Sequence, residues 1–355
     1  MIGTLLKYTS RAFELTRCTN ITIANVTLLG SGKGVVGGSN NSALSILSCR
    51  FLPYKPGGLL GAQSFITGGE IGMWVENMEK SLAPDDNMAC ISSRARLKGV
   101  NAEGIATGGL YTTKAGDQVL LWDEKVGEPT VVTITKAWGN KGQKVPTGLT
   151  DDRRTFTAKF NKTAAQINSA MKRPKNASFK RVMLFRYNPN NGDFVYRNNK
   201  ILGGSAGCMY HGNRGLIEGN EIVNCRGTGL QASHLSPNQA AGCGARNVVI
   251  KNNTIKNTGK VAIKSISTAN IGGNLVIKNN HIIYTLENGS LWNAIQISGA
   301  SDEVVIKDNT IESELKPEKR NGGVSWIRVD KSGEVALKDN KIIGKFTGVQ
   351  LMRRR

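Results

Sequence analysis

The sequence predicts an all-β chain folded as a right-handed parallel β-helix, a solenoid with an internal asparagine ladder, interrupted by a small β-rich, barrel-like insertion. Glycine contributes 42 of 355 residues and asparagine 33, whereas aromatic residues make up only 6%. This mixture favours short strands and turns over helices, in which each interior glycine costs about 1 kcal/mol. A strand–turn–strand unit, typified by Val249–Ile255, recurs at irregular intervals. Solenoids of parallel strands keep their coils in register while their loops vary in length.

Residues 1–109 are expected to form the N-terminal coils, with weaker copies of the unit. The copies are Ile21–Leu28, Leu44–Phe51 and Trp74–Glu79, which place Val26, Cys49 and Met78 at the ladder position. The first residues contain no recognisable secretory signal, and no polar cap precedes the first coil. We therefore expect an N-terminus that is truncated.

Residues 110–186 break the repeat and are expected to form the inserted β-rich subdomain. Gly116–Trp122 and Thr130–Trp138 have the pattern of an antiparallel hairpin, and Lys162–Met171 that of one short helix. Residues 153–186 hold ten Lys and Arg and no acid, nearly half of the net charge of +21. Such a run indicates either a solvated face or contact with an anionic polymer. No recognition motif accompanies the charge, so a nucleic-acid partner is only weakly indicated.

Residues 187–355 are expected to form the C-terminal coils, where the repeat is clearest. The second asparagine of each unit, which we assign to the ladder, falls at Asn199, Asn220, Asn253, Asn280, Asn309 and Asn340. In another strand of each coil, the period-two alternation predicts a row of side chains on the outer face. The row consists of Met209, Gln231, Lys264, Gln296, Arg328 and Gln350. Long amides and cations suit the recognition of sugar hydroxyls or carboxylates, although the row would also serve as a soluble exposed face. His211 and His234 follow the same strands and are expected to line the same groove.

The best candidate for catalysis is the adjacent acid pair Asp85–Asp86. Proximity pushes the pKa values of two carboxyl groups apart, so that one stays charged and the other protonated. A general base and a general acid of this kind are what glycoside hydrolysis requires. Glu70 or Glu76 would supply a third carboxylate. The six cysteines form no CxxC pair and are expected to be buried fillers rather than metal ligands. No apolar run is long enough for a membrane span.

The chain also resembles a known family. The chain contains in order a coil, the strand after Asp85–Asp86, an insertion opening with Gly116–Val119, and then Asn-Asn coils. This order resembles that of the β-helical exo-α-1,3-galactosidases that cleave blood group B. The likeness runs from about Ala12 to Ile255, and beyond it the pattern is shared with pectate lyases and polygalacturonases. The resemblance implies that Asp85 and Asp86 are catalytic, that the anomeric carbon is inverted, that no cofactor is needed, and that the protein is secreted or periplasmic. The chain departs from the family at Ala89 and Ile91, which replace an Asn and a His.

From these observations we expect a glycoside hydrolase acting on an oligo- or polysaccharide, neutral or anionic. Asp85 and Asp86 would be catalytic, and the expected substrate-binding residues are Glu70, His211, Gln231, His234 and Lys264. One alternative is a polysaccharide lyase on an anionic glycan, which would need a Lys, Arg or His base and a neutralising cation, either a side chain or Ca²⁺. The other is a non-catalytic β-helix that binds glycan or serves as a structural element, because fold alone does not choose among these functions.

Overall fold

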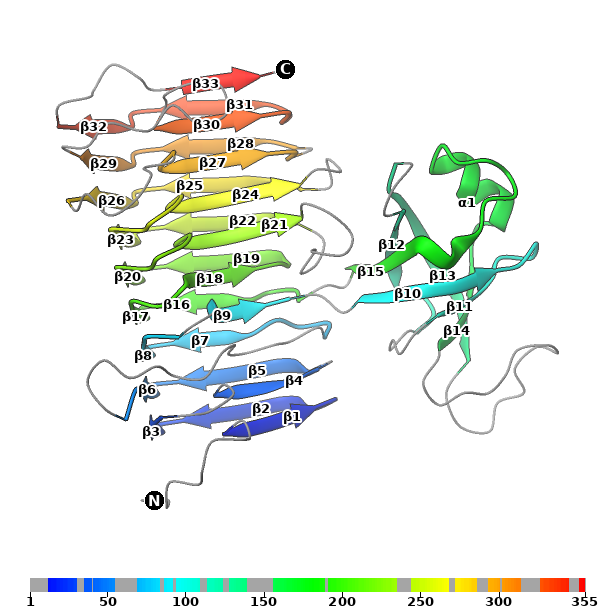
Figure 1. Ribbon diagram of the computed structural model, residues 1–355, viewed down its shortest axis with the longest axis horizontal. Helices are drawn as coiled ribbons and strands as arrows, with labels where there is room; N and C mark the ends of the chain where they lie inside the picture. Colours follow the sequence, from blue (N-terminus) through cyan, green and yellow to red (C-terminus); the bar gives the residue numbers. More distant parts are fainter. Residues whose placement is uncertain are drawn as a thin grey trace.

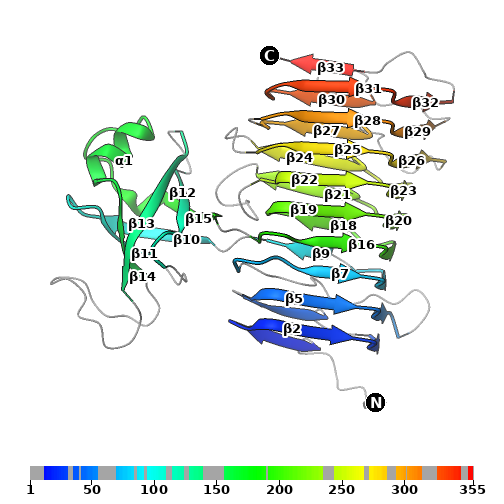
Figure 2. The same cartoon turned by 180° about the vertical axis from the view of Figure 1, so that it is seen from behind.

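The computed structural model consists of a parallel β solenoid with an antiparallel barrel beside it (Figure 1). The structure describes residues 12–30, 35–39, 41–54, 69–83, 86–91, 94–108, 114–123, 128–138, 156–188, 191–234, 244–267, 272–285, 293–300, 302–313, 326–344 and 351–354. Seen from behind, the coils stack in chain order from one end of the solenoid to the other (Figure 2). The predicted fold class is confirmed.

Three parallel sheets form the walls of the solenoid, and each coil from β7 onward contributes one strand to each wall. The first sheet has the order β2 (Thr19–Ala24), β5 (Ser42–Leu47), β7 (Trp74–Glu76), β16 (Val195–Arg197), β19 (Asn213–Glu218), β22 (Arg246–Lys251), β25 (Leu275–Lys278), β28 (Val304–Lys307) and β31 (Val335–Lys338). The second has the order β3 (Thr27–Leu29), β6 (Arg50–Leu52), β8 (Glu79–Ser81), β17 (Lys200–Leu202), β20 (Glu221–Val223), β23 (Thr254–Lys256), β26 (His281–Tyr284), β29 (Thr310–Ser313) and β32 (Lys341–Ile343).

The third sheet consists of the strands that follow the second-sheet strands along the chain, starting with β9. It has the order β9 (Asp86–Cys90), β18 (Ala206–Tyr210), β21 (Leu230–His234), β24 (Ile263–Ser267), β27 (Ile295–Ser298), β30 (Ile327–Asp330) and β33 (Leu351–Arg354). A separate parallel pair, β1 (Phe13–Thr16) and β4 (Val36–Ser39), precedes the first-sheet strands of the two N-terminal coils.

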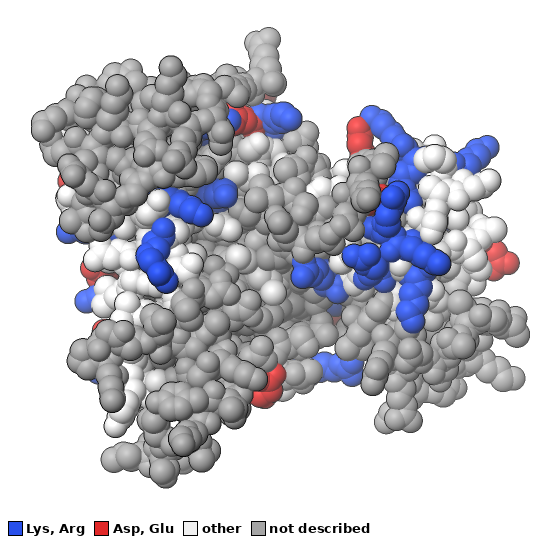
Figure 3. Space-filling model, viewed as in Figure 1, with Lys and Arg blue, Asp and Glu red and all other residues white. Residues whose placement is uncertain are grey.

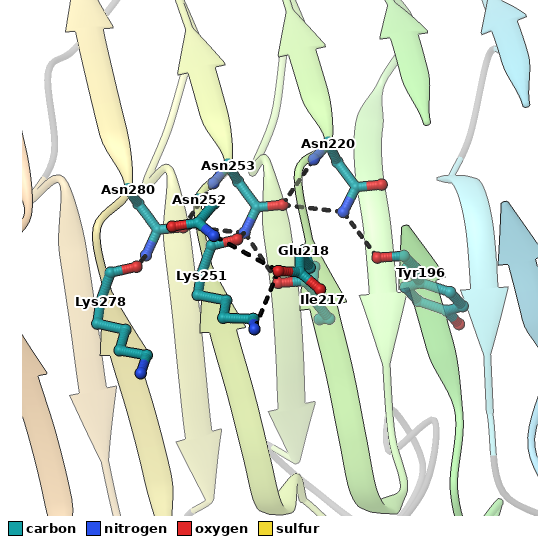
Figure 4. Close-up of polar contacts among 9 residues, drawn as sticks. All are labelled: Tyr196, Ile217, Glu218, Asn220, Lys251, Asn252, Asn253, Lys278 and Asn280. Carbon is teal, nitrogen blue, oxygen red and sulfur yellow. Dashed lines mark hydrogen bonds and ion pairs between the residues drawn. The ribbon is translucent and has the colours of Figure 1, made fainter. Parts of the chain in front are cut away.

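The predicted asparagine ladder joins the first and second sheets (Figure 4). Each ladder amide donates to the next side chain along the column; Asn220 Nδ2, for example, lies 2.9 Å from Asn253 Oδ1. The same amide also donates to the main chain of the preceding coil, at the carbonyl of Tyr196, 2.9 Å away. The residue before the ladder position adopts a positive φ, as at Asn252 (56°) and Asn279 (55°), which asparagine tolerates well. The stacked column therefore satisfies buried polar groups at every turn.

The N-terminal coils continue the column with apolar side chains. Val26, Cys49 and Met78 occupy it, because their carbonyls accept from the first residue of the next coil's second-sheet strand, as the ladder carbonyls do. Asn199 Oδ1 accepts from Met78 N at 3.0 Å, so the amide column ends on the main chain of Met78. These three predicted positions are confirmed.

The insertion is a closed six-stranded antiparallel barrel of order β10-β11-β14-β13-β12-β15. Its elements are β10 (Arg94–Val100), β11 (Ile105–Gly108), β12 (Gln118–Asp123), β13 (Thr130–Trp138), β14 (Phe156–Phe160), α1 (Ala164–Ala170), the 3₁₀ turn η1 (Phe179–Arg181) and β15 (Val182–Asn188). The expected hairpin and helix are both present, as β12–β13 and α1. The barrel starts at Arg94, however, and not at residue 110. The sequence does not separate β10 and β11 from the solenoid, because an alternating pattern alone does not distinguish antiparallel from parallel pairing.

Among the described residues, an ion pair and an arginine contact hold the barrel beside the solenoid. Lys114 Nζ from the barrel lies 2.6 Å from Glu70 Oε1 of the solenoid. Arg246, at the start of β22, donates from Nη2 to the carbonyl of Tyr187 at 2.5 Å, and its guanidinium stacks 3.8 Å from the centre of the Tyr187 ring. The barrel is therefore anchored at the edge between the third and first sheets, where the chain leaves β9 and returns to β16.

Candidate functional site

The outer face of the third sheet carries the predicted polar row. The strand register aligns Met209 with Gln231, Gln231 with Lys264, Lys264 with Gln296, and Gln296 with Arg328. All five side chains are intermediate in exposure, while their strand neighbours Ile263 and Ile295 are fully buried. Neighbouring strands lie about 4.8 Å apart, so the row is a continuous track across the coils. The next position is Met352 and not Gln350, which lies outside the described residues.

The row places polar groups in a partly desolvated setting. Burial, and then the charge of Lys260, lower the pKa of Lys264 below its ordinary value. Gln296 Oε1 is shielded from solvent and has no hydrogen-bond partner among the described residues. Arg328 Nε lies 2.5 Å from Asp330 Oδ2, which fixes its guanidinium on the same face. Amide and cationic groups held in this way are suited to bind hydroxyl or carboxylate oxygens.

The strand that begins at Asp86 is the first strand of this sheet. Ala89 of β9 pairs with Met209, so β9 extends the row by one further position. Asp86 pairs with Ala206 and lies three residues before Ala89, which corresponds to about 10 Å along the strand. The side chain of Asp86 and the whole of Asp85 lie outside the described residues. The structure therefore places the main chain of the predicted acid on the strand that continues the row, three residues before the row position.

The structure separates His211, Glu70 and Glu76 from this row. His211 follows β18 but is fully buried, so the expectation that it lines an outward groove is wrong. It lies at the junction with the barrel, where Asn191 Nδ2 donates to the carbonyls of both His211 and Ile91 at 3.0 Å, and this packing encloses it. His234 ends β21, beside Ser267, and its side chain is outside the described set.

The two candidate third carboxylates are both engaged in ion pairs. Glu70 is bound to Lys114 at the barrel junction. Glu76 lies on the first sheet, where Arg197 Nε and Nη2 donate to its two oxygens at 3.0 Å. The hydrogen bond from Arg197 is the main cause that lowers the pKa of Glu76. An ionised carboxylate fixed on another wall is poorly placed to serve the third sheet.

Sequence reasoning missed two buried polar residues beside β9. Lys80 is 0% exposed, and its Nζ donates to the carbonyl of Asn87 at 2.5 Å. Asn87 is likewise 0% exposed and donates to the carbonyls of Ala206 (2.6 Å) and Gly203 (3.1 Å). The available signal was a lysine at a strand position that holds Phe51 one coil before and Ile201 one coil after.

A basic face on the barrel lies on the same side of the molecule as the third sheet (Figures 1 and 3). In Figure 3, Lys and Arg side chains gather over β10 and over the segment between α1 and β15. The alternation of β10 exposes Arg94, Arg96 and Lys98, and the adjoining η1 exposes Lys180 and Arg181. We call these five residues the basic barrel face. Within the described part of the chain, no group of three or more His, Cys, Asp or Glu side chains could hold a metal ion.

The comparisons with known proteins support the fold. Residues 183–311 match a family model described as the right-handed beta helix region. A search of the curated proteins finds no match for this chain. None of the helices that the structure describes has the length and apolarity needed to cross a membrane. The cysteines at positions 49, 90, 208 and 225 are buried, and Cys18 is partly buried.

Proposed function

We propose that this β-helix protein is a carbohydrate-active enzyme, a glycoside hydrolase that binds its substrate along the outer face of the third sheet. The observation that carries the proposal is the continuity of β9 with the polar row: the strand that begins at Asp86 pairs with the strand that carries Met209, and Gln231, Lys264, Gln296 and Arg328 follow. A glycan chain lying across the coils would meet these groups in turn and place one glycosidic bond near the start of β9.

In the proposed reaction, Asp85 and Asp86 divide the roles of acid and base. The protonated carboxyl gives its proton to the oxygen of the leaving group, and the ionised one activates a water on the opposite face of the sugar, with inversion at the anomeric carbon. Gln231 and His234 would bind hydroxyls of the bound sugar, and Lys264 would donate to a hydroxyl or carboxylate. Glu70 belongs to this site only if substrate displaces Lys114. His211 takes no part, because it is buried.

The charge distribution favours an anionic glycan over a neutral one. Lys264 and Arg328 lie in the row, and the basic barrel face is on the same side of the molecule. Single-stranded nucleic acid is a poorer fit, because its binding depends on exposed aromatic side chains on which bases stack. The large exposed hydrophobic residues that the structure describes are Leu29, Tyr54, Ile71, Trp74 and Ile343, all on the solenoid.

The test is turnover of 4-nitrophenyl α-galactoside and of polygalacturonate, each by the wild-type chain and by Asp86→Asn. We expect release of a reducing sugar of inverted configuration, and a fall of about 10³-fold in rate for the variant, as for loss of an acid or base. Equal turnover by Asp86→Asn would refute the hydrolase mechanism. An unsaturated, ultraviolet-absorbing product formed equally by both proteins would identify a lyase, and salt-sensitive binding without turnover would identify a non-catalytic binder.

A further inference from the structure

We infer that Lys80 and Asn87 are positioning residues that hold the start of β9, and with it the acid at Asp86, in a fixed place and charge state. The inference rests on the proposed function, because it gives a role to residues behind the proposed catalytic strand. The inference is based on a set of buried polar contacts at the corner of the solenoid between β8 and β9.

Lys80 points into the solenoid from an interior position of the second sheet. Its register partners on the adjoining coils are Phe51 and Ile201, both fully buried, and Ile222 follows on the coil after. Side chains at this position therefore form an apolar column, and Lys80 replaces one member of it with an ammonium group. The free energy of taking one such ion out of water is unfavourable by several kcal/mol unless other groups compensate.

The contacts of the ammonium group lead directly to β9. Lys80 Nζ donates to the carbonyl of Asn87, the residue that follows Asp86. The Asn87 amide then donates to the carbonyls of Gly203 and Ala206, which belong to the next coil. Three segments, namely β8, the start of β9 and the turn before β18, are thereby tied together through side chains. Asn87 Oδ1 is buried and has no hydrogen-bond partner among the described residues.

The backbone of the next coil is shaped to admit this group. Gly204 adopts a φ of +92°, and a Cβ at that position would lie 2.8 Å from Asn87 Nδ2 and 2.6 Å from the carbonyl of Ala83. A larger residue would therefore displace the Asn87 amide. The polar contacts depend on a glycine at a strained position, which is the kind of local exception expected at functional sites.

The physical consequence concerns the charge of Asp86. A cation within a few ångströms of a carboxyl group favours the ionised form and lowers its pKa. An ammonium bonded to the carbonyl of Asn87, the residue after Asp86, would favour the ionised form of the Asp86 carboxyl, as a general base requires, and leave Asp85 as the group that carries the proton. Lys80 would thus separate the roles of two neighbouring acids that the sequence alone does not distinguish.

Lys80→Met tests the inference, with Ile201→Met as the matched control at the same interior position one coil on. Methionine keeps the length of the side chain and removes the charge, so we expect unchanged or raised thermal stability, as when buried ions are replaced by apolar groups. We expect turnover of the substrate identified above to fall by about 10²-fold, the usual cost of a small misplacement in an active site. We also expect the pKa of Asp86, measured by carboxyl ¹³C NMR and assigned with Asp86→Asn, to rise. Ile201→Met should change neither quantity.

The outcomes separate this inference from the proposed function. If Lys80→Met keeps both the wild-type turnover and the wild-type pKa of Asp86, the inference is overturned while the hydrolase proposal stands. If Asp86→Asn is fully active, the hydrolase proposal fails first. Should Lys80→Met not fold, Asn87→Ala provides the second variant, because it retains the buried lysine and removes the two amide hydrogen bonds. An unchanged pKa of Asp86 in a folded Asn87→Ala variant, together with full activity, would again refute the positioning role.

Discussion

The solenoid and the barrel bury their polar groups in two different ways. In the solenoid, each ladder amide is bonded to like neighbours above and below, as Asn253 is to Asn220 and Asn280. In the barrel, one buried ion pair links distant segments: Arg173 Nε lies 2.9 Å from Asp123 Oδ2, and both side chains are almost completely enclosed. Repetition therefore distributes the free-energy cost of burying polar groups over many equivalent contacts, whereas the closed barrel places that cost on a few residues.

The two regions should accordingly respond differently to single substitutions. A solenoid contacts only its neighbouring coils, so damage stays local and depends on the position along the stack. The barrel strands surround one main core, built from residues such as Val119, Ile134 and Phe160, so its elements should unfold together. Substitutions at the buried polar groups of each region test this comparison.

The largest effect is expected at the barrel ion pair. Arg173→Leu would take the guanidinium at 2.9 Å away from the buried Asp123 carboxylate, whereas Arg181 Nε lies 3.9 Å from it. It would also remove the hydrogen bonds to Asn168 Oδ1 and the carbonyl of Ser178. We expect a loss of about 3–5 kcal/mol in barrel stability, the usual result of removing one partner of a buried pair.

Hydrogen exchange measured by mass spectrometry on the full chain checks this expectation, because it reports each region separately. Exchange should accelerate throughout β10–β15 and stay unchanged in the coils from β19 onward. The double variant Asp123→Leu, Arg173→Leu is the control and should be more stable than the single one. A uniform acceleration across the solenoid would contradict the separation of the two regions.

A smaller effect is expected in the ladder, and it should depend on position. Asn253→Ala removes donors to the carbonyls of Ile217 and Lys251 and an acceptor for Asn220, all at a fully buried site. Each unsatisfied buried group costs about 1–3 kcal/mol, so we expect a loss of about 3 kcal/mol. Asn340→Ala, at the less buried end of the column, should cost about 1 kcal/mol. Urea unfolding of both variants measures the difference, and equal losses would show that the column does not act through its buried position.

The same difference between the repeated solenoid and the single barrel determines which parts of the fold the sequence predicts. The ladder from Asn199 to Asn340 was predictable because each coil repeats a pattern that pins the register, and even Cys49 and Met78 could be placed by spacing alone. The beginning of the barrel at Arg94 could not, because β10 alternates as a solenoid strand does and only its partners, β11 and β15, distinguish the two.

In the candidate site, too, the sequence predicts the position of some residues and not of others. Gln231 and Lys264 were placed correctly on the outer face, because alternation within a strand fixes which face a side chain occupies. His211 was misplaced because it follows the end of its strand, where the barrel junction and not the alternation decides burial. Lys80 was overlooked because its strand matches the repeat poorly, so that the exceptional residue could not be recognised against a regular background.

The smallest expected effect lies where the two regions meet, at Asp117 of the barrel. Burial is the main cause that raises the pKa of this carboxyl; the nearby charge of Glu70 raises it further, while the backbone hydrogen bond from Lys114 and the charges of Arg186 and Lys114 oppose the rise. A carboxyl whose pKa is raised by folding favours the folded state while protonated. That contribution to stability is complete below the ordinary pKa of 3.8 and is lost as the pH rises through the pKa of the folded state.

Asp117→Asn cannot ionise and keeps an oxygen that can accept from Lys114 N, so it should raise the unfolding temperature slightly at pH 7, by a margin that shrinks as the pH is lowered toward 3.8. Thermal unfolding across this pH range, with Glu70→Gln as a second variant that removes the negative charge adding to the rise, measures the margin. A lower unfolding temperature for Asp117→Asn at pH 7 would mean that the cations at the junction outweigh burial, and that the solenoid and the barrel are joined by charge at Asp117 as well as at Glu70.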